Sequence, residues 1–378
     1  MKLLRVATIV GTRPEVIRLS SVIKRLENSF DHKLIHTGQN YDYELNRLMF
    51  EDLELREPDV VLEPRKSSLG EMIGDILAGT ERALRTLKPD AVLVLGDTNS
   101  CLAAIMAKRL HIPVFHMEAG NRCFDENVPE ETNRRIIDHI ADFNLTYTEH
   151  ARRNLLNEGI ESRRIYVTGS PMREVLEHYR SAIVSAQPLG EIGLTAGKYV
   201  LVSTHREENV DNSHRLQTLM ETLETVVTEF DVPVVVSAHP RLRKRLEGLR
   251  SSIGERIILQ KPFGFIDYNN LQMNALCTLS DSGTISEEAA ILGFPAVTIR
   301  TSIERPEAMD TGSIIVAGIS KENVIPAMHL TISQWAAGQQ PEVPEDYQIR
   351  NTSQRVVNLI GGLARMHSEW SGVRAISE

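Results

Sequence analysis

The stretch LRVATIVGTRPE, residues 4–15, decides the fold. It begins as an apolar run rich in β-branched side chains, which predicts a buried strand over Leu4–Val10. Gly11 permits a tight turn after this strand, and Pro14 suits the first turn of a helix. A buried strand that turns directly into a helix is the repeating unit of a parallel sheet covered by helices. The stretch therefore predicts an α/β protein.

The same alternation of strand and helix recurs along the chain. The further strands expected in the first half are 33–36, 91–95, 114–117, 144–146 and 165–167. Those expected in the second half are 199–203, 233–237, 257–259, 278–279, 296–299 and 314–316. A polar segment at 181–198, with one proline and three glycines, separates the two series. We predict two Rossmann-like domains, 1–180 and 190–345, and a C-terminal helix at about 351–370 that packs back on the first.

The composition limits the partners and the compartment that we expect. The 378 residues are 42% hydrophobic, enough for two cores, and the formal net charge is −9. This acidic balance argues against general binding to nucleic acid or to an anionic membrane. No apolar stretch has membrane-spanning length, and the three cysteines lack CxxC spacing. We therefore expect a cytoplasmic protein without a disulfide framework or a thiolate zinc site.

Several motifs of cofactor-dependent and hydrolytic enzymes are missing from the sequence, namely GxGxxG, GxxxxGK[ST], HExxH, GxSxG and a D-x-D pair. Their absence lowers the expectation of NAD, ATP or a metal ion, and we expect no cofactor. An anionic ligand of this acidic protein must then be held by individually placed residues.

Two arginines follow the first predicted strand. In open α/β sheets, ligands bind at the carboxyl ends of the strands. Arg13 lies there beside a helix N-terminus, which favours an anion, and Arg18 lies one turn further on. The two cations predict a phosphate contact, with an ordinary turn and a solvated arginine as the alternative.

Three carboxylates mark the same edge of the first half. Asp97 comes one residue after the strand at 91–95, Glu118 follows the strand at 114–117, and Glu130 stands in the first turn of the next helix. Asp97 has a structural explanation as a helix cap, and so does Glu130, because acids are favoured in a first helical turn. Together, however, the three carboxylates predict a cleft suited to proton transfer at carbon.

Polar groups also follow the strands of the second half. His205 could bond a phosphate or move a proton, although a lone histidine is as often structural, and His239 is a less distinctive second case. The segment Asp281-Ser282-Gly283-Thr284 starts a helix whose amides and hydroxyls could hold a diphosphate. Glu288, one turn in, could accept from ribose hydroxyls. An ordinary Ser-Gly helix start would look the same.

These motifs together resemble the non-hydrolysing UDP-N-acetylglucosamine 2-epimerase family over almost the whole chain. In chain order, the matching motifs are GTRPE (11–15), GDT (96–98), EAG (118–120), PEE (129–131), HR (205–206), DSG (281–283) and ERPE (304–307). The resemblance implies a B-type glycosyltransferase-like architecture with the active site in the cleft between two domains. It also implies a UDP-sugar substrate and a homodimer.

The resemblance implies roles for individual residues. Asp97, Glu118 and Glu130 would be the acid and base groups, and His205 would assist the departure of UDP. The contacts to the substrate and UDP would come from Arg13, Arg18, Phe263, Tyr268, Ser282, Gly283, Thr284, Glu288 and Arg305. Two positions depart from the family pattern, because Arg18 replaces a usual lysine and Thr284 replaces a usual second glycine.

Two segments, 36–43 and 121–127, look more like one branch of the family. That branch converts UDP-2-acetamido-2,6-dideoxy-L-talose to UDP-N-acetyl-L-fucosamine for capsule or O-antigen, and UDP-N-acetylglucosamine is the alternative substrate. The bacterial UDP-N-acetylglucosamine enzymes carry a regulatory site to which a pair of glutamines contributes. Only Gln39 of that pair matches, with Asp42 at the other position.

The family's chemistry is consistent with these residue types. Carbon 2 of a UDP-sugar has no adjacent carbonyl, so a carboxylate cannot remove its proton directly. Elimination of UDP to a 2-acetamidoglycal, then re-addition with protonation from the opposite face, needs carboxylates at both faces and cations near UDP. The rival functions are a glycosyltransferase of the same architecture, a hydrolysing epimerase and a UDP-sugar sensor without catalysis.

Overall fold

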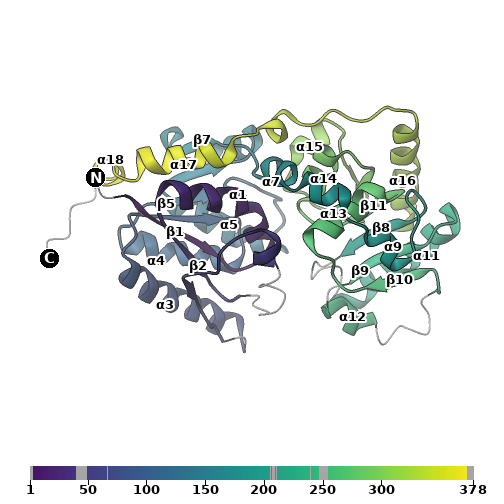
Figure 1. The fold of residues 1–378 in the computed structure, drawn as a ribbon, viewed down its shortest axis with the longest axis horizontal. Helices are drawn as coiled ribbons and strands as arrows, with labels where there is room; N and C mark the ends of the chain where they lie inside the picture. Colours follow the sequence, from purple (N-terminus) through teal and green to yellow (C-terminus); the bar gives the residue numbers. More distant parts are fainter. Residues whose placement is uncertain are drawn as a thin grey trace. The chain divides into compact units, whose positions relative to one another are not determined.

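The computed structural model describes residues 3–39, 49–65, 67–204, 206, 209, 211–238, 240–246 and 254–372. The chain divides into two compact units, Met1–Val175 with Ile349–Glu378, and Leu176–Gln348. Each unit contains one parallel sheet with helices packed on it (Figure 1). The predicted α/β class with two Rossmann-like domains is confirmed.

The first unit holds a seven-stranded parallel sheet with the order β3-β2-β1-β4-β5-β6-β7. Its strands are β1 (Arg5–Val10), β2 (Asp31–His36), β3 (Val60–Val61), β4 (Ala91–Leu95), β5 (Val114–Met117), β6 (Phe143–Thr146) and β7 (Ile165–Val167). The predicted strands are all present, and β3 is an addition. Two residues at the sheet edge are too few to leave an alternating pattern in the sequence.

The second unit holds a six-stranded parallel sheet with the order β10-β9-β8-β11-β12-β13. Its strands are β8 (Val200–Thr204), β9 (Val234–Ala238), β10 (Ile257–Gln260), β11 (Cys277–Ser280), β12 (Ala296–Thr298) and β13 (Ile315–Val316). In both sheets the strand order reverses direction once, between β1 and β4 and between β8 and β11. Such switch points are where open α/β sheets bind ligands.

The helices cover these sheets. In the first unit they are α1 (Arg13–Ser29), α3 (Leu69–Leu87), α4 (Ala104–Arg109), α5 (Pro129–Ile140), α6 (Glu149–Asn157), α17 (Thr352–Leu363) and α18 (His367–Trp370). Those of the second unit are α8 (Arg180–Ser185), α9 (Pro188–Ile192), α11 (Ser213–Phe230), α12 (Pro240–Leu246), α13 (Phe265–Asn274), α14 (Ile285–Leu292), α15 (Pro306–Asp310) and α16 (Lys321–Ala336). Helix α7 (Met172–His178) contains the division between the units. Among the described residues, no helix is long and apolar enough to cross a bilayer.

Helix α1 begins where the opening stretch of sequence predicts. Thr12 is the N-cap, Glu15 completes a capping box, and a proline stands in the first turn. The buried side chains of α1 recur at helical spacing, among them Val16, Leu19 and Ile23. Helix α17, drawn in yellow in Figure 1, packs against α1 and so belongs to the first unit.

The division between the units falls before the predicted linker at 181–198. That segment carries α8 and α9 and belongs to the second unit. Leu189, Ile192 and Leu194 pack against a buried cluster that contains Tyr199 and Leu201. Because these apolar side chains bury themselves in the second core, the segment is part of a domain, despite its loop-like content of glycine and proline.

A substitution at Gly120 tests how tightly the turn after β5 is packed. Its φ is +82°, and an added Cβ would lie 2.3 Å from the carbonyl oxygen of Ala151. Gly120→Ala should therefore lower the free energy of unfolding by about 2–4 kcal/mol. In the control Gly190→Ala, the new Cβ meets nothing within 4 Å, and the change should stay below about 1 kcal/mol. Urea unfolding followed by circular dichroism measures both, and equal midpoints would contradict the packing described here.

Candidate functional site

Three turns of the first unit open side by side at one edge of its sheet. They are Gly11–Glu15 after β1, Gly96–Thr98 after β4 and Glu118–Gly120 after β5. Because β1, β4 and β5 are consecutive and parallel in the sheet, their carboxyl ends meet at this edge. The polar residues that the sequence places after these strands are thus neighbours in space.

Glu118 and Arg18 form an ion pair in this group of turns. Arg18 Nη1 donates to Glu118 Oε2, and Asn121 Nδ2 lies 3.4 Å from Glu118 Oε1. The two charged side chains are only 15% and 9% exposed. Glu118 also has a φ of +66°, a left-handed conformation that is uncommon outside glycine. The carboxylate therefore lies in a partly buried position, as expected for a residue that ends an apolar strand.

Asp97 is held by an arginine that the sequence analysis does not single out. Arg134 Nη2 lies 2.7 Å from Asp97 Oδ2, and Arg134 Nη1 lies 2.9 Å from Glu131 Oε2. Asn133 Nδ2 donates to the backbone oxygen of Asp97 at 2.9 Å. The Asp97 carboxylate is 23% exposed, so it remains accessible from solvent while one side is held by Arg134.

Glu131, rather than Glu130, makes the described contacts at the start of α5. Its carboxylate is 4% exposed and accepts from the Cys123 amide and thiol, both at 3.2 Å. Desolvation opposes its charge, but these bonds and Arg134 keep the pKa of Glu131 below its usual value. Glu130 lies half-buried in the same first turn. The spacing of Glu131 and Arg134, three residues apart on one helix, is the signal that could have revealed this pair.

Glu15 joins the turn after β1 to the turn after β4. Its Oε2 accepts from the amides of Gly11 at 2.7 Å and Thr12 at 3.3 Å, while Oε1 accepts from the Thr98 hydroxyl. Burial raises the pKa of Glu15 to about 7, against the opposing effect of these donors. Arg13 is half-buried beside it, and desolvation lowers the pKa of its guanidinium although the charge of Asp52 acts in the opposite direction.

In the second unit, Asp281 connects the ends of β8 and β11. Its Oδ2 accepts from the Thr204 hydroxyl at 2.7 Å, the Arg206 amide at 3.2 Å and Asn209 Nδ2 at 3.0 Å. Asp281 is completely buried. His205 and His239, which the sequence analysis places at these strand ends, lie outside the described residues.

A chain of hydrogen bonds between hydroxyl groups and a carboxylate follows Asp281 along the sequence. The hydroxyls of Ser282 and Thr284 lie 3.0 Å apart, and Thr284 Oγ1 donates to Glu288 Oε1 at 2.7 Å. Gln272 Nε2 donates to Glu288 Oε2 at 2.8 Å. Thr284 thus has a structural partner at the position where the family pattern has glycine. Each oxygen of the buried Glu288 keeps a further lone pair with which it could accept from a ligand.

Arg305 supports the turn at Gly283 from within the protein. Its Nε donates to the Gly283 carbonyl at 2.8 Å, and its Nη1 lies 3.3 Å from Glu287 Oε1. The neighbouring Glu307 accepts from the hydroxyl of Tyr347 at 2.7 Å, and burial raises the pKa of this carboxyl. Arg305 is only 2% exposed, and these two contacts join it to the Gly283 turn and to α14.

Phe263 and Tyr268 stand at the start of α13. Both pack against the buried cluster around Tyr199 and Leu271, and each residue as a whole is half-buried. The Tyr268 hydroxyl is buried even so, and desolvation raises its pKa above the usual value. Phe263 and Tyr268 thus keep part of their surface exposed in the second unit.

Comparison with known proteins decides the family. Residues 24–361 match the family model described as UDP-N-acetylglucosamine 2-epimerase. The chain belongs to this family. It is therefore an isomerase, as the seven motifs predicted.

Solved and curated relatives agree with this assignment. The structure of UDP-N-acetylglucosamine 2-epimerase from Rickettsia bellii is 43% identical, with a TM-score of 0.92 over 98% of this chain and 100% of that one. The UDP-N-acetylglucosamine 2-epimerase of Methanocaldococcus jannaschii is 37% identical over 88% of this chain and 93% of its own length. Its crystal structure with UDP-GlcNAc and UDP is 34% identical, with a TM-score of 0.88, and covers 95% of this chain and 99% of that one.

A third relative has another substrate in its name. The UDP-2,3-diacetamido-2,3-dideoxy-D-glucuronate 2-epimerase of Pseudomonas aeruginosa is 33% identical and covers 88% of this chain and 93% of its own length. The position of epimerisation is thus shared between relatives whose named sugars differ at other carbons. Membership of the family fixes the reaction class of this epimerase and leaves the sugar to be determined.

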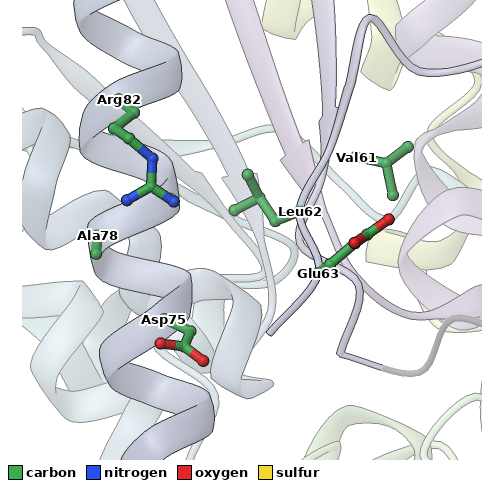
Figure 2. Close-up of a pocket in the computed structure, with 7 residues that line it drawn as sticks. Val61, Leu62, Glu63, Asp75, Ala78 and Arg82 are labelled. Carbon is green, nitrogen blue, oxygen red and sulfur yellow. The ribbon is translucent and has the colours of Figure 1, made fainter. Parts of the chain in front are cut away.

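A surface hollow of about 380 Å³ lies between α3 and the segment after β3 (Figure 2). Asp75 and Arg82 border it from α3, and Leu62 and Glu63 border it from the segment after β3. Asp75 already pairs with Arg65 at 2.8 Å. The hollow contains none of the candidate site residues, so we do not place the reaction there.

His36 ends β2 next to the site and is neutral in the folded protein. Its Nδ1 accepts from the Gly38 amide at 3.0 Å, which requires that this nitrogen carry no proton. The residue is completely buried, and desolvation lowers its pKa to about 4. The next residue, Thr37, bonds Ser100 at 2.7 Å, and Ser100 also donates to Gln39.

The pKa of His36 predicts acid sensitivity. Between pH 6.5 and about 4 the unfolded chain binds a proton at His36 that the folded protein does not, so stability falls as pH falls through this window. His36→Gln should flatten the pH dependence of unfolding by about 3 kcal/mol across the window. His214→Gln, at an exposed histidine, is the control and should leave the slope unchanged. Identical slopes for wild type and His36→Gln would contradict the prediction.

Proposed function

We propose that this epimerase inverts carbon 2 of a UDP-2-acetamido sugar by elimination and re-addition of UDP. The observation that carries the proposal is the pair of carboxylates, Asp97 and Glu118, on the adjacent turns after β4 and β5, beside the switch point of the first sheet. An arginine holds each of them while leaving part of the carboxylate exposed. Two oriented carboxylates on neighbouring turns suit proton exchange at two faces of one carbon.

The proposed reaction balances without a further reactant. The bond between carbon 1 and the UDP oxygen breaks and its electron pair leaves with UDP, so positive charge grows at carbon 1 and acidifies the carbon 2 proton. One carboxylate takes that proton, which leaves a 2-acetamidoglycal. A second acid then protonates carbon 2 from the opposite face as UDP re-adds to carbon 1. Glu130 stays a candidate third group, since it lies in the first turn of α5.

The second unit is proposed to hold UDP. The Ser282–Thr284 turn offers hydroxyls and amides to the diphosphate, and Glu288 offers lone pairs to the ribose. The segment from Phe263 to Tyr268 offers aromatic surface to the uracil. Arg305 supports the turn from behind, and His205 is proposed to assist the departure of UDP.

Arg13 and Arg18 are proposed to meet the diphosphate from the first unit. Arg18 pairs with Glu118 in the described structure. A diphosphate would compete for the guanidinium of Arg18, and the loss of that partner would make Glu118 a stronger base. Binding of UDP and activation of a carboxylate would thus be linked through one arginine.

We propose UDP-2-acetamido-2,6-dideoxy-L-talose as the substrate and UDP-N-acetyl-L-fucosamine, for capsule or O-antigen, as the product. Support comes from the segments 36–43 and 121–127, which resemble that branch. The names of the relatives from Rickettsia bellii and Methanocaldococcus jannaschii support the alternative, UDP-N-acetylglucosamine. A homodimer and a cytoplasmic location complete the proposal.

Incubation in D₂O tests the reaction and the substrate together. Each of the two UDP-sugars is incubated with the protein and followed by proton NMR. We expect the signal of the proton on carbon 2 of the L-talose compound to disappear as its epimer forms, because the hydrogen that is added to carbon 2 comes from solvent as deuterium. Faster exchange of UDP-N-acetylglucosamine would select the alternative substrate. Free UDP and sugar without exchange, or no exchange with either compound, would contradict the proposed epimerisation.

Replacing the carboxylates tests the residues. Asp97→Asn and Glu118→Gln keep the shape of each side chain but remove its proton-transfer group, so turnover should fall by at least about 10²-fold. UDP binding, measured by calorimetry, should not weaken in either variant, because neither carboxylate is proposed to contact UDP, and in Glu118→Gln the release of Arg18 should favour the diphosphate. Glu81→Gln, at an exposed residue of α3 that pairs with Arg85, is the control. Near-normal turnover in both site variants would exclude the assigned roles.

A further inference from the structure

We propose that His116 is a positioning residue that ties together the two turns carrying Asp97 and Glu118. The inference rests on the proposed role of these carboxylates in proton transfer at carbon 2. His116 lies in β5, the strand that ends in Glu118, and its side chain is completely buried. It therefore contacts no substrate, and it acts through the backbone of the neighbouring turns.

The imidazole ring of His116 bridges two groups of the site. Its Nε2 lies 2.8 Å from the carbonyl oxygen of Gly96, the residue directly before Asp97. Its Nδ1 lies 3.0 Å from Asp138 Oδ1. The two oxygens of Asp138 in turn accept from the amide of Gly120, two residues after Glu118, at 3.2 and 3.1 Å. One ring thus joins the backbone beside one carboxylate to the backbone beside the other.

The chemistry of the partners orients the ring. A carbonyl oxygen and a carboxylate oxygen only accept, so Nε2 must carry the hydrogen of the bond to Gly96, and Nδ1 must also carry one to be attracted to Asp138. The ring that joins both is then an imidazolium in an ion pair with Asp138. On the other side, Arg122 Nη1 lies 2.7 Å from Asp138 Oδ2, and Arg122 also forks with Glu158 at 2.7 and 2.6 Å. The Arg122 and Asp138 side chains are completely buried. These bonds fix Asp138, and through it they fix the ring that faces it.

The turns need such support because their backbone is unusual. Gly96, Glu118 and Gly120 all have positive φ, of +74°, +66° and +82°. This conformation is sterically unfavourable for Glu118, which has a Cβ atom, but not for glycine. A residue other than glycine keeps a positive φ only where the surrounding structure imposes it. Two acids that serve opposite faces of one carbon must also hold their separation closely, since a displacement of about 1 Å can cost about 10²-fold in rate.

Three substitutions separate the two arms of the bridge. His116→Phe keeps the ring but removes both polar contacts. His116→Gln can place an amide donor near Nε2 and so keeps the Gly96 arm while it loses Asp138. His116→Asn can place an amide near Nδ1 and so keeps the Asp138 arm while it loses Gly96. His32→Phe is the matched control, because His32 is buried in β2 and bonds Thr8 within the sheet, away from these turns.

The first readout is the split between kcat and KM. His116→Phe should lower kcat by about 10- to 100-fold and leave KM within about threefold, because the carboxylates are displaced while UDP contacts stay. His32→Phe should keep a kcat near that of wild type at a similar melting temperature. A kcat of folded His116→Phe within threefold of wild type would overturn the proposal, and so would equal losses of kcat in both phenylalanine variants.

The second readout is deuterium partitioning in D₂O, which a general loss of stability would not move. The glycal can be protonated on either face. The ratio of deuterium in recovered substrate to deuterium in product therefore reports how fast each of the two acids protonates carbon 2 relative to the other. His116→Gln releases the turn of Glu118, and His116→Asn releases the turn of Asp97. We expect the ratio to move in opposite directions in the two variants. Shifts in the same direction, or none, would overturn the bridge even if His116→Phe does not fold.

These outcomes also separate the bridge from the function on which it rests. If wild type introduces no deuterium at carbon 2, the proposed epimerisation fails. If wild type exchanges and epimerises while the His116 variants match it, the proposed reaction stands and the positioning role fails.

Discussion

Parallel strand order is the constraint on which the rest of this structure depends. Within each sheet all strands run the same way, so each turn that follows a strand opens at the same edge. Residues separated by about a hundred positions, such as Arg18 and Glu118, meet only because β1 and β5 both end at that edge. The order and direction of the strands therefore determine which residues meet in the site of the first unit, and the chemistry of their side chains determines what they can do there.

Charge placed at this edge requires compensation, and arginines provide it. Glu118 faces Arg18, Asp97 faces Arg134, and Asp138 faces Arg122. A buried carboxylate without a partner would strongly destabilise the fold, whereas a paired one contributes little net stability but keeps a fixed orientation. The main effect of these ion pairs is therefore to hold each carboxylate in a fixed orientation. The two outer pairs retain some exposure, whereas the pair behind them is completely buried.

Much of this arrangement could be predicted from the sequence, and the reasons for the misses are physical. The strands were predictable because buried parallel strands leave continuous apolar runs, and Asp97 and Glu118 stood out because they end such runs. His116 and Asp138 did not stand out in the sequence, because their roles depend on contacts between β5, α5 and the turn after β4, which no local pattern encodes. The segment 181–198 reads as a linker by composition, yet a few leucines and isoleucines place it in the second core.

The return of the chain to its first unit has a consequence for biosynthesis. The second unit is one continuous segment, Leu176–Gln348, whereas the first is completed only by residues after Ile349. Helix α17 buries Val356, Val357 and Ile360 and packs against α1, near the opposite end of the chain. On the ribosome, the part of α1 that α17 covers must wait until the whole second unit and the residues after Ile349 have emerged. The first unit thus begins before the second and closes after it, and in the interval the nascent chain has an exposed surface for a chaperone to cover.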